Sequence, residues 1–524
     1  MRSHAKVNLK KGRNDLLSLI NFNSTDGFSH SAMNTQTRKN SFFSLDFCRR
    51  SRVARDVRYD GIFFSGASTT KIYCRPICPG RPPLELNNIF FQSRTQAEEA
   101  GFRPCLRCRP ELAPDHPIQK AVGWQVRNAL GRIHQGLFAN KVIAAQTVPA
   151  NTTQRQLAID FFATIGTTLP RYWQTFQLGF AKMLFTDTAL SLEDIASITR
   201  FDDSRGMLDA LSSLYRRDPL AFRKPLSVKI QPDLKSCALL LSYRPPFDWS
   251  ALINYFRARA VAGVEKVTGE AYQRSLCLNG HQGWLSLQNV PNVNAVRLEV
   301  HASDLSCLMQ VVWRVRRMLD LDADPLSLGA FFGKDPLLGP AWLRHPGLRV
   351  PVGWDAFEFA VRAIVGQLVS VGVATKLVGN IVEAFAENLS LPAPKGIEKV
   401  FPSPACLQRA EMRPCGLTRT KAAAIVGLAQ AVVNGTIDLE NVSDLDTFIQ
   451  QCTALRGIGE WTAQTIGMRG LGDKDAFPAS DLGIVKALST DSQPSKPAHI
   501  RKMAERWRPW RAYAAMLLWM MRPN

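Results

Sequence analysis

The stretch LRGIGEWTA, residues Leu455–Ala463, predicts two helices joined by a short hairpin. Its two glycines, Gly457 and Gly459, permit backbone conformations that other residues avoid and let a ligand approach the main-chain N–H groups. The start of the following helix also favours an anion such as a DNA phosphate. By itself this pattern is a weak signal, because many such hairpins only bind the nucleic-acid backbone.

Two further features follow the hairpin. Asp481 lies 22 residues after Gly459, where it could cap the next helix or act as a carboxylate at a reaction centre. The chain then closes with RWRPWRAYAAMLLW, residues Arg506–Trp519, which contains three tryptophans. Aromatic stripes at helical spacing usually belong to a core, so each feature alone remains ambiguous.

Length and charge limit the class of protein. At about 100–200 residues per domain, the 524 residues predict roughly three to five domains. The net charge of +21 favours a polyanionic partner, with nucleic acid ahead of a membrane surface. We find no apolar run of about 18 residues and no secretory signal, so we expect a cytoplasmic protein that does not span a membrane.

Four cysteines form two close pairs in the N-terminal part, Cys74-x3-Cys78 and Cys105-x2-Cys108. Two such pairs joined by a loop are the usual way to present four thiolates to a tetrahedral zinc ion. The spacing leaves open a structural zinc ribbon, free or disulfide-bonded cysteines, and a zinc-activated nucleophilic thiolate. Arginines around thiolates lower the thiol pKa and attract phosphate. Five surround these cysteines: Arg75, Arg81, Arg103, Arg107 and Arg109.

The sequence RYDGIFFSGASTTKIYCRPICPGRPP…AGFRPCLRCRPE, Arg58 to Glu111, strongly resembles the zinc domain of the Ada-type methyl-phosphotriester repair proteins. The resemblance implies one zinc ion per chain and transfer of a methyl group from a damaged phosphate to Cys74. A zinc-bound thiolate stays ionised at neutral pH, and the thioether product has no easy way back, so the transfer is stoichiometric. The implied zinc ligands are Cys74, Cys78, Cys105 and Cys108.

The same resemblance implies DNA contacts at three positions of this domain. These are Thr70, Arg81 and Arg103. The family has an arginine directly after the second zinc cysteine, and this chain has Pro79 there. That difference weakens one expected phosphate contact.

Residues 121–225 are predicted to be helical, with Ser191 as an N-cap and a helix over Asp203–Tyr215. The sequence SLEDIASITRF…SRGMLDALSSLYRRDPLAFRK resembles the second half of an AraC-type helix-turn-helix domain, and Asn140–Trp173 resembles the first half. The usual turn glycine is Arg200 here, and the second recognition helix offers few cations or amides. Sequence-specific DNA reading and a helical spacer that reads no sequence both remain open.

Alternating and helical patterns organise the rest of the chain. The segment from Asp355 to Ala386 has the apolar spacing of long buried helices. The preceding segment combines strand-like runs with one helical run. These runs are Cys237–Tyr243, Trp284–Gln288, Ala295–Val300 and, for the helix, Leu305–Leu319.

Taken together, the hairpin, Asp481 and the final tryptophans resemble the helix-hairpin-helix DNA glycosylase superfamily. The similarity is close to the 3-methyladenine glycosylase II branch and runs from about residue 238 to residue 522. SYRPPFDWSALINYFRARAVAGVE, Ser242–Glu265, is similar to the start of that enzyme's N-terminal domain. DAFEFAVRAIVGQLVSVGVATKL, Asp355–Leu377, is similar to its central helices.

The glycosylase resemblance implies a role for each matching residue. Asp481 is the catalytic carboxylate, and Leu368 is the wedge that fills the hole left by the flipped base. An alkylated purine is cationic and stacks well on electron-rich rings. The implied pocket aromatics are Trp461, Trp519 and Tyr255, and the implied phosphate-binding glycines are Gly457 and Gly459.

Departures from the family pattern refine these expectations. Thr465 and Leu482 replace two tyrosines, so we expect a wider or less aromatic pocket with an altered base preference. Trp461 stands where lyase members have a nucleophilic lysine, which predicts a monofunctional enzyme. No cysteine follows Cys452, so a C-terminal iron–sulfur cluster is not expected. The chain also lacks a Pro-Cys-His-Arg acceptor motif for O-6-methylguanine.

We therefore expect a multidomain α+β protein of bacterial alkylation repair, active at the cytoplasmic nucleoid. Its expected partners are double-stranded, alkylated and promoter DNA, with RNA polymerase as a further partner and no membrane. The alternative is a transcription regulator whose glycosylase fold only binds DNA. The expected parts are a disordered extension (1–45), a small zinc-bound α/β domain (46–120), an all-α helix-turn-helix domain (121–225), a mixed α/β glycosylase N-terminal domain (226–346) and an all-α helix-hairpin-helix glycosylase domain (347–524).

Overall fold

The computed structural model describes residues 44–115, 123–138, 154–223, 235–440, 442, 444–489 and 495–521. Almost all of the predicted N-terminal extension lies outside the described residues. The chain divides into two compact units, residues 1–48 and 49–524. The second unit holds every described strand and every described helix except the first residues of α3 (Leu45–Val53). Within the described ranges, each helix is too short or too polar to pass through a lipid bilayer.

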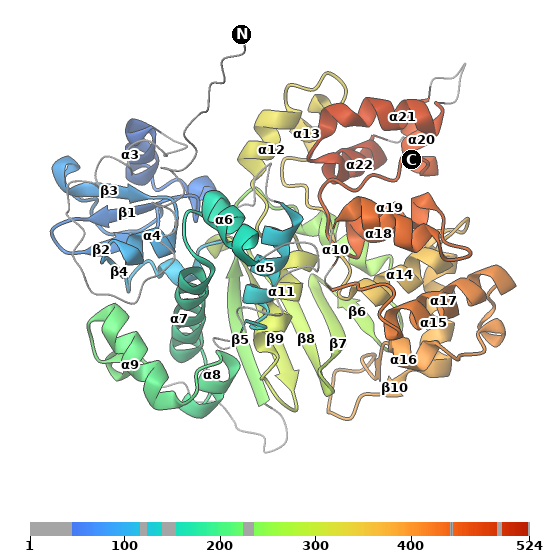
Figure 1. The fold of residues 1–524 in the computed structure, drawn as a ribbon, viewed down its shortest axis with the longest axis horizontal. Coiled ribbons are helices and arrows are strands. Elements are labelled where there is room, and N and C mark those ends of the chain that lie inside the picture. Colours follow the sequence, from blue (N-terminus) through green and yellow to red (C-terminus); the bar gives the residue numbers. More distant parts are fainter. Residues whose placement is uncertain are drawn as a thin grey trace, which may run out of the picture. The chain divides into compact units, whose positions relative to one another are not determined.

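A small four-stranded sheet forms the first part of the second unit (Figure 1). Its strand order is β3-β1-β2-β4, with β1 antiparallel to both neighbours and β2 parallel to β4. The core beneath it is small and aromatic, with Phe64, Tyr73, Phe91 and Phe102. The elements are β1 (Phe64–Ala67), β2 (Ile72–Cys74), β3 (Asn88–Phe91), α4 (Arg94–Glu99) and β4 (Arg103–Pro104).

The middle region is helical, as predicted. Ser191 caps α8, because its hydroxyl accepts from the Asp194 N–H at 3.0 Å, and Asp203 caps α9 in the same way. Arg200 adopts φ +61°, so an arginine takes the left-handed conformation that the family's glycine would supply. Residues 140–153 of the predicted first half lie outside the described residues. The helices are α5 (Trp124–His134), α6 (Gln154–Ile165), α7 (Leu169–Asp187), α8 (Leu192–Ile198) and α9 (Ser204–Tyr215).

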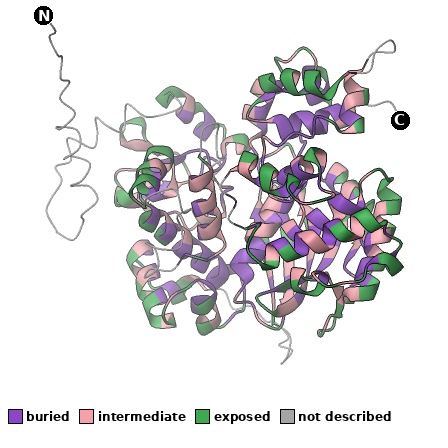
Figure 2. Cartoon of the chain, turned by 45° about the vertical axis from the view of Figure 1, so that its right-hand side comes forward, coloured by how far each residue is buried: buried purple, intermediate pink, exposed green. Residues whose placement is uncertain are grey.

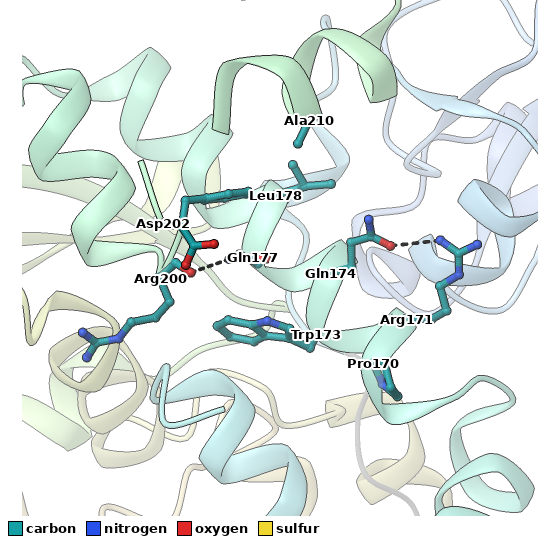
Figure 3. A pocket seen from close by; sticks show the side chains of 10 residues that line it. Pro170, Arg171, Trp173, Gln174, Gln177, Leu178, Arg200, Asp202 and Ala210 are labelled. Atoms are coloured by element: carbon teal, nitrogen blue, oxygen red, sulfur yellow. Dashed lines mark hydrogen bonds between the residues drawn. The ribbon is translucent and has the colours of Figure 1, made fainter. Parts of the chain in front are cut away.

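A hollow of about 470 Å³ lies beside α7 and the turn between α8 and α9 (Figure 3). The Gln177 amide donates to the carbonyls of Thr199 at 2.9 Å and Arg200 at 3.1 Å, which fixes one wall. None of the predicted site residues lines this hollow.

A five-stranded antiparallel sheet of order β5-β9-β8-β7-β6 follows. The predicted strands and the predicted helix are all present, and the structure adds β6 and β7. One hydrophobic core joins this sheet, α11 and the helices of the middle region. The elements are β5 (Lys235–Ser242), α10 (Trp249–Arg257), β6 (Glu265–Thr268), β7 (Ala271–Leu278), β8 (His281–Val290), β9 (Ala295–Ala302), α11 (Leu308–Met318), α12 (Pro325–Phe332) and α13 (Gly339–Arg344).

The C-terminal region is helical and has two hydrophobic clusters, and α19 contributes to both through Ile466 and Met468. Figure 2 shows exposed outer sides and buried inner sides on these helices. The elements are α14 (Ala356–Val365), α15 (Val371–Phe385), β10 (Glu387–Asn388), β11 (Lys399–Val400), α16 (Pro404–Leu407), α17 (Arg419–Val433), α18 (Leu445–Thr453), α19 (Glu460–Arg469), α20 (Leu482–Leu488), α21 (Pro497–Ala504) and α22 (Arg511–Met520).

One fully buried arginine, Arg244, joins the zinc-binding part to the mixed domain. Its guanidinium donates to the Asp60 carbonyl at 2.9 Å and to the Pro114 and Asp115 carbonyls at 3.2 and 2.5 Å. It also donates to the Asp322 carbonyl at 3.0 Å. Buried carbonyls need donors, so this one side chain satisfies main-chain groups from three separate segments.

Candidate functional site

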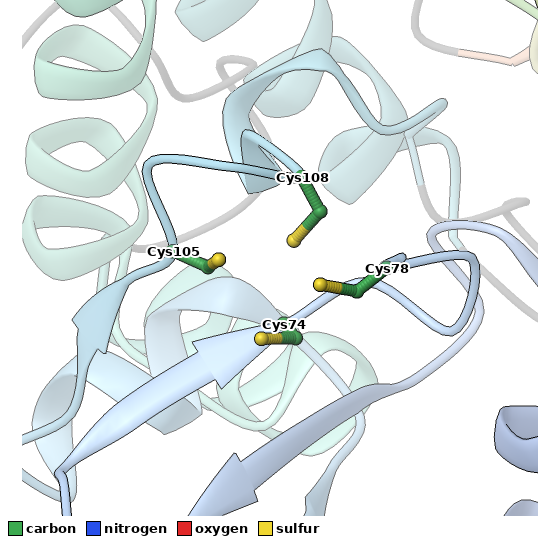
Figure 4. A group of neighbouring side chains, drawn as sticks. All are labelled: Cys74, Cys78, Cys105 and Cys108. Atoms are coloured by element: carbon green, nitrogen blue, oxygen red, sulfur yellow. The ribbon is translucent and has the colours of Figure 1, made fainter. Parts of the chain in front are cut away.

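The four cysteines converge because of the way the small sheet ends. Strands β2 and β4 are parallel, with Tyr73 opposite Pro104, and the Cys105 N–H donates to the Tyr73 carbonyl at 3.0 Å. Cys74 and Cys105 therefore leave neighbouring strands at the same end. Cys78 and Cys108 follow on the next turns, and all four Sγ atoms lie within 4.8 Å of one another (Figure 4).

The cluster fits a zinc ion. A tetrahedral site with Zn–S bonds of about 2.3 Å needs S···S separations of about 3.8 Å, which this grouping provides with little adjustment. The cysteines form no disulfide. Main-chain N–H groups also point at the sulfurs, from Arg75 to Cys108 Sγ at 3.3 Å and from Gly80 to Cys78 Sγ at 3.4 Å. Such donors favour the thiolate form that zinc requires.

Exposure separates the cysteines into two kinds. Cys78 and Cys108 are buried, whereas Cys74 and Cys105 are partly exposed. An electrophile can therefore reach only one thiolate of each pair. Cys74, the predicted methyl acceptor, is one of these two.

The structure corrects the expectation that all five surrounding arginines attract phosphate. Arg75 is buried and pairs with Asp60, and Arg109 pairs with Glu111 and Asp187. These two guanidinium groups form ion pairs within the protein, so we do not expect them to bind phosphate. The other residues, three of which are predicted DNA contacts, are exposed or partly exposed: Thr70, Arg81, Arg103 and Arg107.

Asp481 has the first of the two roles that the sequence left open, and its surroundings bear on the second. It is the N-cap of α20, because Oδ1 accepts from the N–H groups of Gly483 at 2.8 Å and Ile484 at 3.2 Å. Two indoles also donate to it, Trp519 Nε1 to Oδ1 at 2.8 Å and Trp461 Nε1 to Oδ2 at 3.0 Å. Four N–H donors therefore fix the carboxylate between the two predicted pocket aromatics.

The predicted wedge has an unusual backbone. Leu368, between α14 and α15, adopts φ +57° and is 95% exposed. A large apolar residue in the left-handed region stores strain, which is typical of functional positions. Neighbouring bonds hold the turn. The Gln367 amide donates to the Gly457 carbonyl at 3.0 Å, and Lys421 Nζ donates to the Gln367 carbonyl at 2.7 Å.

The hydrogen bond from the Gln367 amide to the Gly457 carbonyl ties the wedge to the predicted phosphate-binding hairpin. Gly457 adopts φ +90°, and a Cβ there would lie 2.9 Å from the Ala424 Cβ, so only glycine fits. Gly459 is the N-cap of α19, and a Cβ there would meet no atom within 4 Å. Space for a phosphate is thus open at the start of α19.

Two arginines that sequence reasoning missed lie against the rings of the predicted pocket aromatics. Arg469 lies 4.6 Å from the Tyr255 ring and 5.0 Å from the Trp519 ring, and Arg259 lies 4.0 Å from the Tyr255 ring. Burial raises the pKa of Tyr255, but these two guanidinium groups outweigh it and hold that pKa below its ordinary value. Helical spacing could have found Arg469, which is eight residues after Trp461 and so shares its face of α19.

The two residues that stand in place of the family's tyrosines, Thr465 and Leu482, have smaller side chains. The Thr465 hydroxyl donates back to the Trp461 carbonyl at 2.7 Å, so its polar group is used within α19. Leu482 is 65% exposed. Neither supplies an aromatic face, and the wider or less aromatic pocket stays a prediction.

Comparisons with known proteins agree with both halves of this description. A family model described as the metal binding domain of Ada matches residues 48–111, and one described as the AlkA N-terminal domain matches residues 238–355. The chain is 34% identical to a probable bifunctional transcriptional activator/DNA repair enzyme AlkA of Mycobacterium tuberculosis H37Rv, over 90% of this chain and 95% of that one.

Two relatives of Escherichia coli K12 match parts of the chain. DNA-3-methyladenine glycosylase 2 is 34% identical over 284 residues, 53% of this chain and 95% of the relative. The bifunctional transcriptional activator/DNA repair enzyme Ada is 47% identical over 64 residues, 12% of this chain and 18% of the relative. The two family models fall on different parts of the chain.

Proposed function

Since the chain belongs to the family of bifunctional transcriptional activator/DNA repair enzymes called AlkA, we propose that it removes alkylated bases of the 3-methyladenine class from DNA by hydrolysis. The observation that carries this proposal is the carboxylate of Asp481, which four N–H donors hold between Trp461 and Trp519. A helix cap alone does not require two indole donors. The two indoles fix the carboxylate beside two aromatic rings, where it can stabilise positive charge.

In the proposed reaction, Leu368 fills the space that the flipped nucleotide leaves, and the hairpin holds a nearby phosphate. The bond between C1′ and the base nitrogen then breaks, the electron pair leaves with the base, and positive charge develops on the sugar. Asp481 stabilises that charge, and water adds to C1′. With Trp461 at the lyase position, the product is an intact abasic strand.

The test compares two aspartates that cap helices in the same way. Asp324 caps α12 through the N–H groups of Leu326 at 3.1 Å and Ser327 at 3.3 Å, as Asp481 caps α20. Asn caps about as well as Asp. We expect Asp481→Asn to lower single-turnover release of 7-methylguanine by roughly 100-fold or more. Asp324→Asn should leave it unchanged, and both variants should bind the damaged duplex.

Release by Asp481→Asn equal to that of Asp324→Asn would make Asp481 a cap only. A wild-type protein that binds the duplex but releases no base would favour the alternative, a regulator whose glycosylase fold only binds DNA. Release is measured by alkali-dependent cleavage, and binding by fluorescence anisotropy.

We further propose that Cys74 accepts a methyl group from a DNA methyl phosphotriester. Its Sγ forms a bond to the methyl carbon, the carbon–oxygen bond breaks, and the phosphodiester leaves as an anion. A zinc ion held by the four cysteines would keep this thiolate ionised. Peptide mass mapping after incubation with methylated DNA should find the methyl on Cys74; a methyl on Cys105, the other partly exposed ligand, would overturn the assignment.

Methylation removes one negative charge from the zinc–thiolate cluster, so it should tighten binding to the DNA backbone. We propose that this change recruits the protein to promoter DNA and RNA polymerase at the bacterial nucleoid. The test is a gel shift with methylated and unmethylated protein, in which equal affinities would count against it. The α9 face offers weak support for base reading, because its exposed residues include Asp209 as well as Arg205.

A further inference from the structure

The backbone of the predicted wedge, Leu368, needs support from its neighbours. Among the non-glycine residues with positive φ in the described ranges, it is the only apolar one. Its side chain is 95% exposed, so packing in a core does not hold it there. The left-handed region costs a non-glycine residue free energy, and bonds to the adjoining main chain must offset that cost.

Lys421, in the first turn of α17, supplies such bonds. Its Nζ donates to the Val365 carbonyl at 2.9 Å and to the Gln367 carbonyl at 2.7 Å. Both carbonyls lie at the C-terminal end of α14, where helices leave acceptors unpaired and favour a cation. The Gln367 carbonyl belongs to the peptide group that contains the Leu368 nitrogen. The bond from Lys421 therefore fixes the peptide plane from which φ of Leu368 is measured.

The side chain of Gln367 is anchored from another direction. Its amide donates to the Gly457 carbonyl at 3.0 Å and to the Thr462 hydroxyl at 2.9 Å. Rotation of the peptide group between Gln367 and Leu368 would leave these two bonds intact. Lys421 opposes that rotation, so it controls a motion that the bonds of the Gln367 amide do not restrain.

The position of Lys421 is not explained by an ion pair. Burial lowers the pKa of this ammonium group, and among the described residues no carboxylate offsets the effect. A lysine that served only solubility would extend into water. The two carbonyls beside the wedge are the groups that stabilise this cation.

We propose that Lys421 is a positioning residue for base flipping, which holds Leu368 in its exposed, left-handed conformation before DNA binds. This inference rests on the proposed glycosylase function, in which Leu368 fills the space left by the flipped nucleotide. A preformed wedge can enter the duplex without a change of backbone. Without Lys421, Leu368 relaxes to negative φ in most molecules, and only the remaining fraction can flip a base.

The experiment uses the full chain and a duplex with one 7-methylguanine. Release is followed in a single turnover with saturating protein, so the rate constant depends neither on affinity nor on the folded fraction. The proteins are wild type, Lys421→Met, Leu368→Ala and the double variant. Lys266→Met is the matched control, because Lys266 Nζ also donates to a main-chain carbonyl, that of Lys395 at 2.9 Å.

We expect Lys421→Met to lower the rate constant about tenfold, the loss of population expected when a non-glycine residue must hold the left-handed conformation unaided. In the Leu368→Ala background the same substitution should change nothing, because no wedge is left to position. Lys266→Met should match wild type.

Four results would overturn the proposal. These are an unchanged rate in Lys421→Met, the same loss of rate in both backgrounds, a full rate in Leu368→Ala, and weaker binding with an unchanged rate at saturation. The last of these would make Lys421 a phosphate contact instead. Wild-type protein that binds the duplex and releases no base would contradict the proposed function itself.

Discussion

The two sites of this chain are assembled in different ways. All four cysteines of the metal centre come from the short stretch Cys74–Cys108, and a parallel pair of strands brings them together. The residues around Asp481 come from α19, the N-terminus of α20 and α22, and α10 adds Tyr255 against Arg469. A local site can be recognised from spacing, whereas a dispersed site exists only after several helices have packed.

The two sites also differ in what their activity requires. The metal centre depends on a complete ligand set, because a three-cysteine site holds zinc less firmly. The glycosylase pocket depends on orientation, because the indoles and the helix start must aim their N–H groups at one carboxylate. Loss of a ligand should therefore abolish one activity, and loss of a single donor should only weaken the other.

The largest expected effect is at the metal centre. Cys105→Ala should remove the bound zinc and abolish methyl transfer to Cys74, while release of 7-methylguanine stays unchanged because that pocket contains none of the four cysteines. Metal analysis, peptide mass mapping and base release measure the three quantities. Cys277→Ala, at an exposed cysteine outside the cluster, is the matched control. Base release that falls together with methyl transfer would show that the sites are not independent.

Next in size is the effect of breaking the link between the two parts of the chain. Arg244→Met should lower the free energy of unfolding by about 3 kcal/mol, because the carbonyls of Asp60, Pro114 and Asp322 lose their buried donor. Urea unfolding measures this change. Arg257→Met, at an exposed arginine of α10, is the control and should have little effect. An equal midpoint for the two variants would mean that Arg244 contributes no net stability.

The sequence predicted the metal centre more fully than the pocket. The cysteine pairs are recognisable from spacing, and the cap Ser191 follows from residue type at the start of an apolar helical pattern. The sequence also left Asp481 open between a cap and a catalytic group, and the structure shows the cap together with two indole donors. The position of those indoles relative to the carboxylate depends on how α19, α20 and α22 pack.

Buried arginines were the main omission. Arg244 and Arg469 carry charge, and a charged residue in an apolar stretch is ordinarily placed at the surface. Their burial depends on partners that are distant in sequence, such as the carbonyl of Asp60 for Arg244 and the ring of Tyr255 for Arg469. Periodicity can assign a residue to a face of a helix, but it cannot identify what that face meets.

A smaller effect is expected from one donor to Asp481. Trp461→Phe keeps an aromatic ring but removes the N–H that reaches Oδ2. We expect the single-turnover rate of 7-methylguanine release to fall about tenfold, the scale of one hydrogen bond to a charged group. Trp510→Phe, in a tryptophan that caps α22 without contacting Asp481, should not change the rate. Equal rates for the two variants would show that the ring alone matters.

The smallest expected effect is a change in stability at Leu368. This residue belongs to the dispersed glycosylase site, but its unusual backbone angle and its exposure are local features. Because this side chain is 95% exposed and has φ +57°, it gives up the stability of burial and also adopts a strained backbone. Leu368→Gly relieves that strain and should raise the free energy of unfolding by about 0.5 kcal/mol, after the greater entropy of the unfolded glycine chain is subtracted. Leu368→Ala keeps the strain and should leave stability unchanged. Both variants lose the wedge, so both should lower the rate of base release by a similar factor. Urea unfolding and single-turnover release on the same preparations separate the two effects. Full activity in Leu368→Ala would contradict the wedge assignment, and a Leu368→Gly variant no more stable than Leu368→Ala would show that the left-handed backbone carries no strain.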